Sequence, residues 1–120
     1  MRFLWCTINV RDMEDSLEFY HEKLGLEIDR QFHTESGMEI VFLGNGETKV
    51  ELICSKSSDI KEIGRDISLG FEVDSLEDMI KSIEEKGLKI HSGPFQPNPH
   101  IRFFYVLDPN GLKIQFVQNL

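Results

Sequence analysis

The chain is poor in several residue types that mark particular classes of protein. It has only two cysteines, Cys6 and Cys54, which do not form a C-x-x-C motif and fall within predicted strands. We therefore expect buried free thiols in a reducing compartment, with a redox pair as the less favoured alternative. No run approaches the ~18 consecutive apolar residues that span a bilayer, and "MRFLWCTINV" lacks the apolar core of a signal peptide. These absences predict a cytoplasmic protein with no membrane partner.

Positive charge is scarce as well. The sequence has 13 lysines and arginines against 21 aspartates and glutamates, which gives a formal net charge of −8. A surface of that sign repels phosphate backbones, so we expect no nucleic-acid partner. The charge balance favours neutral or cationic small ligands over polyanions.

The residues that are present predict a single domain. A chain of 120 residues is long enough to bury one core. Hydrophobic residues make up 40% of it and charged residues 28%, which is ordinary for a globular protein.

The predicted elements occur in the same order twice. Alternating or apolar runs predict strands, and apolar residues at helical spacing predict helices. The first half reads as strand "FLWCTINV", helix "RDMEDSLEFYHEKLG" and strands "LEIDRQFH", "MEIVFLG" and "KVELICS". After the polar stretch "KSSDIKEIGRD", the second half reads as strand "ISLGFEV", helix "DSLEDMIKSIEEKG" and strands "LKIHS", "RFFYVL" and "LKIQFV". In the first helix Asp12 is a suitable N-cap and Gly25 a C-terminal stop.

The two halves also match residue by residue at an offset of roughly 63, an internal repeat of the kind that defines a fold. Val10 matches Val73, Glu14 matches Glu77, and "VELI" from Val50 matches "IQFV" from Ile114. We therefore predict an α+β fold of two tandem βαβββ modules, 1–56 and 64–120, within one domain spanning 1–120. The sheets would curl into an incomplete barrel around a cleft, with the helices outside.

Strand alternation assigns side chains to the two faces of each predicted sheet. One set, which includes Ile8, Val10, Val50 and Leu52, would pack against the helices. The opposite set would face the cleft: Trp5, Thr7, Asn9, Lys49, Glu51, Ile53, Ser68, Gly70, Glu72, Lys113, Gln115 and Val117.

Three stretches carry a resemblance to a known superfamily: "NVRDMEDSLEFYHEKLGL", "VELI" and "FYVLDPNGLKIQF". Together they resemble the vicinal oxygen chelate superfamily, which includes glyoxalase I, the bleomycin-resistance proteins and the extradiol dioxygenases. The resemblance covers essentially the whole chain, and its opening is similar to bacterial glyoxalase I. It implies a small-molecule ligand and a homodimer.

The resemblance also implies four metal-ligand positions, which fall on Trp5, Glu51, Ser68 and Gln115. Imidazole and carboxylate groups are the donors that hold divalent transition metals. Among the four residues at these positions, only Glu51 carries such a group. The glutathione-binding arginine of glyoxalase I falls on Asn9. We therefore expect no metal and no other cofactor, with Gln115 as a hydrogen-bonding group in a cleft that has lost its metal. The alternative for Gln115 is a polar residue that serves only the sheet.

The remaining candidates point to ligand binding. Trp5 is either a core residue or a platform on which a planar or cationic group stacks. Glu51 and Glu72 would repel each other in one cleft unless a cation arrives. Arg102 follows "GPFQPNP", a stretch read as a loop at the cleft mouth together with His100. The four histidines show no ligand-pair spacing, so we expect them at the surface.

These observations predict a small-molecule binder of the bleomycin-resistance type. The expected ligand is partly aromatic or cationic, and the expected binding residues are Trp5, Thr7, Asn9, Glu51, Ser68, Glu72, Arg102 and Gln115. The alternative is a glyoxalase-like lyase or isomerase in which Glu51 is the catalytic base or a ligand for Ni or Zn.

Overall fold

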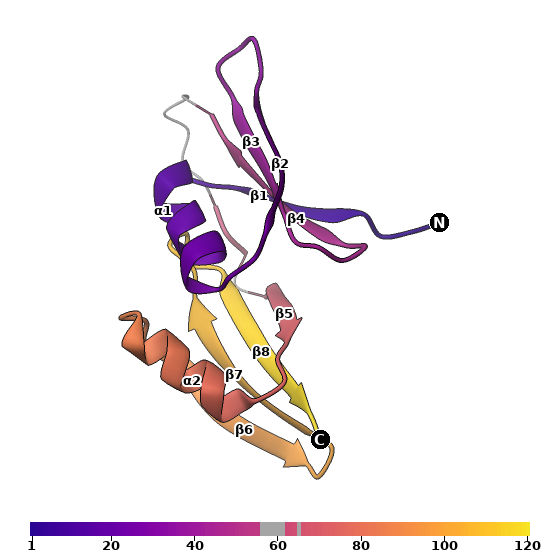
Figure 1. The fold of residues 1–120 in the computed structure, drawn as a ribbon, viewed down its shortest axis with the longest axis vertical. Coiled ribbons are helices and arrows are strands. Elements are labelled where there is room, and N and C mark those ends of the chain that lie inside the picture. The colour runs from indigo at the N-terminus through magenta and orange to yellow at the C-terminus, as the bar shows by residue number, and fades with distance from the viewer. Residues whose placement is uncertain (56–61, 65) are drawn as a thin grey trace. The chain divides into compact units, whose positions relative to one another are not determined.

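The computed structural model of the chain describes residues 1–55, 62–64 and 66–120. It divides into two compact units, Met1–Glu62 and Ile63–Leu120, which we call the first and second modules. Each has one four-stranded mixed sheet, and neither sheet is closed into a barrel (Figure 1). The predicted α+β class with two βαβββ modules is confirmed. The single domain over 1–120 and the cleft stay predictions, and most of the predicted polar connection lies outside the described residues.

The first module follows the predicted order. Its elements are β1 (Trp5–Asn9), α1 (Met13–Leu17), η1 (Glu18–Lys23), β2 (Ile28–His33), β3 (Glu39–Leu43) and β4 (Lys49–Cys54). The strand order in the sheet is β1-β4-β3-β2, with β1 parallel to β4 and the other pairs antiparallel.

The second module repeats this topology. Its elements are β5 (Ser68–Glu72), α2 (Leu76–Glu85), β6 (Ser92–Asn98), β7 (Ile101–Leu107) and β8 (Lys113–Asn119). The strand order is β5-β8-β7-β6, and β5 is again parallel to β8. The duplication seen in the sequence is therefore a duplication of the sheet as well.

The first helix begins and ends on the residues that the sequence predicts, and the second has equivalent ends. Asp12 caps the first by accepting a hydrogen bond from the Asp15 amide at 2.8 Å, and Ser75 caps the second in the same way. Gly25 and Gly87 end them with φ values of +84° and +81°, a conformation that favours glycine.

The first helix differs from the prediction in its second half, where η1 is a π-helix. The neighbouring aromatic residues Phe19 and Tyr20 are both buried there and meet edge to face at 4.9 Å. A wider turn brings adjacent side chains to the same side of a helix. The apolar spacing of the sequence does not distinguish this turn from an α-helical one.

The core of each module lies between its helix and one face of its sheet. In the first module α1 contacts β4, and Ile8, Val10 and Leu52 are almost completely buried. In the second, α2 contacts β8, and Leu76 and Ile83 are buried with these strand residues: Phe104, Val106, Ile114 and Phe116. Burial of each such side chain contributes about 1.5–3 kcal/mol. In β1, β4 and β8 the helix-facing residues are those that strand alternation predicts.

The position of the sixth strand corrects a prediction. We expected it at residues 88–92 followed by a loop, whereas β6 spans Ser92–Asn98. Proline is a turn signal in most contexts, but β6 is an edge strand that pairs only with β7, and edge strands tolerate residues without an amide hydrogen. Pro94 and Pro97 both lie within it, and each falls in a stretch where the register shifts, Ser92–Phe95 for Pro94 and Phe95–Asn98 for Pro97. His100 lies in the short turn before β7.

Smaller predictions have mixed outcomes. All four histidines are exposed, as expected. Cys6 and Cys54 are free thiols, but they are half-buried rather than buried. No helix in the described ranges has the length and apolar character needed to cross a membrane.

Candidate functional site

Each sheet has one face covered by the helix of its own module and one face that is not. We call the uncovered faces the first and second open faces. The first is defined by Trp5, Thr7, Asn9, Arg30, Phe32, Phe42 and Glu51, and the second by Ser68, Gly70, Glu72, Ser92, Phe95, Phe103, Tyr105, Lys113 and Gln115. Strand alternation and the observed registers place each set on one side of its sheet.

Glu51 is the carboxylate of the first open face. It is 9% exposed, which is unusual for an acidic side chain outside a core. The parallel register puts it beside Thr7, whose hydroxyl donates a hydrogen bond of 2.5 Å to Glu51 Oε1. From the other neighbouring strand, Phe42 lies directly opposite. Glu51 is thus held between one hydroxyl donor and one aromatic ring.

Trp5 and Phe42 belong to an aromatic cluster on the same face. The Trp5 ring meets the Phe42 ring edge to face, with 5.2 Å between the ring centres. Phe32 stacks on Phe42 with 6.5 Å between the ring centres. The guanidinium carbon of Arg30 lies 4.3 Å from the centre of the Phe42 ring, a cation–π contact. Trp5 itself remains 41% exposed. Its ring is therefore not enclosed in a core and has a surface on which another group can stack.

Gln115 occupies the position of Glu51 in the second module but has different neighbours. Its amide Nε2 donates to the Tyr105 hydroxyl at 3.2 Å. On the other side, the register pairs it with Gly70, where an added Cβ would lie 3.3 Å from Gln115 Oε1. The glycine therefore leaves room for the amide to lie over β5. This hydrogen bond links β8 to β7 on the open face, and the role of Gln115 in ligand binding stays a prediction.

An aromatic cluster is also present on the second open face. The ring centre of Phe103 lies 5.6 Å from that of Phe95 and 5.8 Å from that of Tyr105. Phe95, Gln96, Pro97 and Phe103 line a hollow of about 450 Å³. The hollow is shallow and open, and its lining is almost entirely apolar.

Three of the other predicted open-face residues are exposed, whereas Lys49, Ile53 and Val117 are half-buried. Asn9, Ser68 and Glu72 are all accessible. Glu72 accepts a hydrogen bond of 2.6 Å from the Asn119 amide group on the neighbouring strand.

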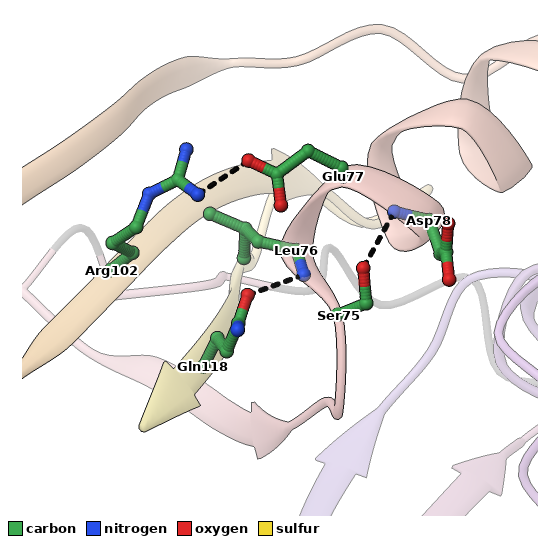
Figure 2. Close-up of polar contacts among 6 residues, drawn as sticks. All are labelled: Ser75, Leu76, Glu77, Asp78, Arg102 and Gln118. Atoms are coloured by element: carbon green, nitrogen blue, oxygen red, sulfur yellow. Dashed lines mark hydrogen bonds and ion pairs between the residues drawn. The ribbon is translucent and has the colours of Figure 1, made fainter. Parts of the chain in front are cut away.

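Arg102 lies on the opposite side of its sheet from Gln115. Figure 2 shows its guanidinium directed to Glu77 at the start of α2, where Nη1 donates to Glu77 Oε1. That hydrogen bond holds the pKa of the Glu77 carboxyl below its ordinary value. On the same side, Gln118 accepts a hydrogen bond of 2.7 Å from the Leu76 amide (Figure 2). The structure therefore places Arg102 at the N-terminal end of α2, and not beside the predicted binding residues of the second module.

The four family metal positions are arranged in the same way in both modules. Glu51 lies two residues beyond the register partner of Trp5, and Gln115 lies two residues beyond that of Ser68. The side chains at these positions do not fit a divalent metal. An indole has no lone pair to offer, hydroxyl and amide oxygens are weak neutral donors, and only Glu51 is a carboxylate. Across residues 1–55, 62–64 and 66–120, no group of three or more histidine, cysteine, aspartate or glutamate side chains could hold an ion.

The aromatic neighbours of Glu51 and Gln115 were missed by the sequence analysis. Phe42 and Tyr105 lie opposite these two residues on the adjacent antiparallel strands. Pairing the strands outward from each hairpin turn would have placed both residues opposite Glu51 and Gln115. Strand alternation would then have placed them on the open faces.

Comparison with known proteins gives a consistent result. The sequence profile of the Glyoxalase/Bleomycin resistance protein/Dioxygenase superfamily matches residues 2–116. The chain is 33% identical over 116 residues to the uncharacterized protein YwbC of Bacillus subtilis, covering 92% of each chain. It is 28% identical over 126 aligned positions to the lactoylglutathione lyase of Neisseria meningitidis, covering 98% of this chain and 91% of the other. Among solved structures, TnmS3, an antibiotic binding protein from Streptomyces, superposes with a TM-score of 0.82 at 20% identity, covering 100% and 97% of the two chains.

Proposed function

The chain belongs to the Glyoxalase/Bleomycin resistance protein/Dioxygenase superfamily, and from that premise we propose that it binds a small, planar, partly aromatic molecule without a resident metal. Glu51 adds a preference for a ligand with positive charge.

The observation that carries this proposal is the chemistry of the four family metal positions. Three of them hold Trp5, Ser68 and Gln115, and the fourth, Glu51, already accepts a hydrogen bond from Thr7. Gln115 is likewise engaged, by Tyr105. A metal would have to displace these contacts and would gain one carboxylate and two weak neutral oxygens in return.

The aromatic clusters supply what such a binding protein needs. Stacking of a planar group on an exposed aromatic ring contributes about 0.5–1.5 kcal/mol beyond the burial of area. Trp5 and Phe95 are both large and more than one-third exposed, on different open faces. The Streptomyces neighbour, named as an antibiotic binding protein, is an example of this fold with a binding function.

Metal content and ligand titration test the proposal together. We expect freshly purified protein to contain no stoichiometric Ni, Zn, Fe or Mn by elemental analysis. We also expect planar aromatic compounds to change the fluorescence of Trp5, the single tryptophan of the chain. A stoichiometric ion that is lost on Glu51→Gln and Gln115→Ala substitution contradicts the proposal.

A second function has specific support and is tested separately. Relatives named lactoylglutathione lyase are similar over 98% of the chain, and Glu51 keeps the carboxylate at a family metal position. The alternative is therefore a glyoxalase-like lyase or isomerase in which Glu51 is the base or binds Ni or Zn. With Asn9 at the position of the glutathione-binding arginine, we expect negligible isomerisation of the methylglyoxal–glutathione hemithioacetal. Efficient turnover with added Ni or Zn would replace the binding function by this enzymatic one.

A further inference from the structure

A second hollow opens on the second open face, next to the aromatic cluster. It is open to solvent, has a volume of about 320 Å³ and is lined by Asp66, Ile67, Ser68, Ser92, Tyr105 and Lys113. The register explains why they meet, because Ser68 is the partner of Lys113 across β5 and β8, and Ser92 is the partner of Tyr105 across β6 and β7.

The polar groups of this hollow are mostly hydrogen-bond donors. Ser68, Ser92 and Tyr105 bring three hydroxyl groups, Lys113 brings an ammonium group, and Asp66 is the one carboxylate. The Tyr105 oxygen accepts from Gln115, so its own hydrogen is directed elsewhere. None of the ion pairs found within residues 1–55, 62–64 and 66–120 involves Lys113. The hollow therefore suits a group that accepts several hydrogen bonds and carries negative charge.

Tyr105 joins this hollow to the aromatic cluster. Tyr105 lines the polar hollow, and its ring centre lies 5.8 Å from that of Phe103, which lines the apolar hollow. A ligand whose planar ring lies against Phe103 and Tyr105 would place a group attached to that ring near Lys113.

We propose that the second module binds planar aromatic monoacids. The carboxylate occupies the hollow of Lys113, Tyr105, Ser68 and Ser92, and the aromatic ring lies on the Phe103–Tyr105 side. Asp66 limits the charge that the hollow accepts, so a monoanion is favoured over a dianion. This inference rests on the proposed function, since it specifies which planar ligands bind. It is independent of the preference for positive charge, which belongs to Glu51 in the other module.

Three probes that share one ring system test the inference by isothermal titration calorimetry at pH 7. We expect 2-naphthoate to bind about tenfold more tightly than 2-naphthalenemethanol, because a hydrogen bond to a charged group typically contributes about that factor. We expect 2-naphthyl phosphate to bind less tightly than 2-naphthoate. Asp66→Asn is expected to reduce the difference in affinity between these two probes.

Variants assign the preference to the hollow. Lys113→Met is expected to remove most of the advantage of 2-naphthoate, and Tyr105→Phe to reduce it several-fold while keeping the ring. Phe103→Ala is expected to weaken the binding of 2-naphthoate and of 2-naphthalenemethanol by a similar factor. Lys81→Met, an equal change of charge at an exposed position of α2, is the matched control and is expected to keep the full preference. Lys113→Gln repeats the test with a polar residue, and circular dichroism confirms that each variant is folded.

The outcomes separate this inference from the proposed function. If 2-naphthoate and 2-naphthalenemethanol bind equally, or if Lys113→Met and Lys113→Gln keep the preference, the acid site is wrong while planar binding stands. If 2-naphthyl phosphate binds best, the restriction to monoacids is wrong. If none of the three probes binds, the inference fails, and the Trp5 fluorescence titration then decides the proposed function by itself.

Discussion

The two modules share one scaffold but differ around a single pair of equivalent residues. In the first, Glu51 lies between Thr7 on β1 and Phe42 on β3, and the hydroxyl of β1 is its hydrogen-bond partner. In the second, Gln115 lies between a glycine on β5 and Tyr105 on β7. Its hydrogen-bond partner is the Tyr105 hydroxyl, which comes from β7 and not from the parallel strand. Each module thus satisfies its polar residue with one hydroxyl from a neighbouring strand.

This difference separates what the scaffold requires from what the site requires. The central helix-facing positions, such as Leu52 and Phe116, are apolar and buried in both modules, because each sheet must pack on its helix. The open-face positions need only a partner for each polar group, and either neighbouring strand can supply it. Residues on the open faces are therefore free to change with the ligand while the fold stays the same.

The largest expected effect lies in the shared part of the comparison. Leu52 and Phe116 are equivalent helix-facing residues, 0% and 2% exposed. We expect Leu52→Ala to cost about 2–5 kcal/mol of unfolding free energy and Phe116→Ala about 3–5 kcal/mol, from lost burial and the cavity left behind. Urea denaturation followed by circular dichroism measures both values.

The controls for these truncations are Ile28→Ala and Leu107→Ala, one in each module and each 39% exposed. They are expected to cost much less than the core truncations. A large loss of stability for one core residue and almost none for its equivalent would show that the modules do not depend on their cores alike.

The next effect tests the hydroxyls that distinguish the modules. Thr7→Val removes the donor of a buried carboxylate, and we expect it to cost about 1–3 kcal/mol. Tyr105→Phe removes a bond between neutral, half-buried groups and is expected to cost about 0.5–1.5 kcal/mol. A double-mutant cycle of Thr7→Val with Glu51→Gln isolates the first interaction in chemical unfolding. If Thr7→Val and Tyr105→Phe lower the unfolding free energy equally, the two hydrogen bonds do not differ in strength as we expect.

A smaller effect concerns binding at Trp5. Trp5→Ala is expected to weaken the binding of a planar ligand by about 0.5–2 kcal/mol through lost stacking. It should destabilise folding by less than the about 3–5 kcal/mol typical of a core aromatic residue. Trp5→Phe keeps a ring and serves as the control. Calorimetry measures binding in both variants, and severe destabilisation by Trp5→Ala without any change in affinity would make Trp5 a structural residue.

The smallest effect is a pH dependence that comes from the Arg102–Glu77 ion pair of the second module. Arg102 lowers the pKa of Glu77 below its ordinary value of 4.5, so the contribution to stability is present above that value and is lost as the pH falls through the lowered pKa. We expect Glu77→Gln to lower Tm by about 1–2 °C at pH 6 and to make no difference in strong acid. Glu14→Gln, at the equivalent exposed position of the first module, is the matched control variant. An NMR titration in which Arg102→Met leaves the Glu77 pKa unchanged would contradict the assignment.

Much of the fold could be predicted from the sequence because its signals are local. Alternation identified the faces of β1, β4 and β8, and the predicted cap Asp12 accepts its hydrogen bond from an amide only three residues away. β6 could not be predicted in this way, because its tolerance of Pro94 and Pro97 depends on its place at the sheet edge.

The candidate site was predicted only where a single strand determines it. Trp5, Glu51 and Gln115 lie on the predicted faces of their sheets. Arg102 was assigned from its closeness to a loop, although alternation along β7 directs it to the helix side, where it meets Glu77. The contacts of Phe42 and Tyr105 depend on pairing between strands, which a reading of one strand at a time does not supply.

The parallel pairing of first and last strands in each module has a consequence for how the protein folds. β1 pairs with β4 through partners such as Thr7 and Glu51, and β5 pairs with β8 through partners such as Ser68 and Lys113. Neither sheet is complete until the two ends of its module have met, and loop closure of that kind slows the folding transition. During synthesis, β5 would remain an unpaired edge until β8 has left the ribosome, with Leu69 and Phe71 without their partner strand. Chaperone binding or aggregation of nascent chains would be concentrated in that interval.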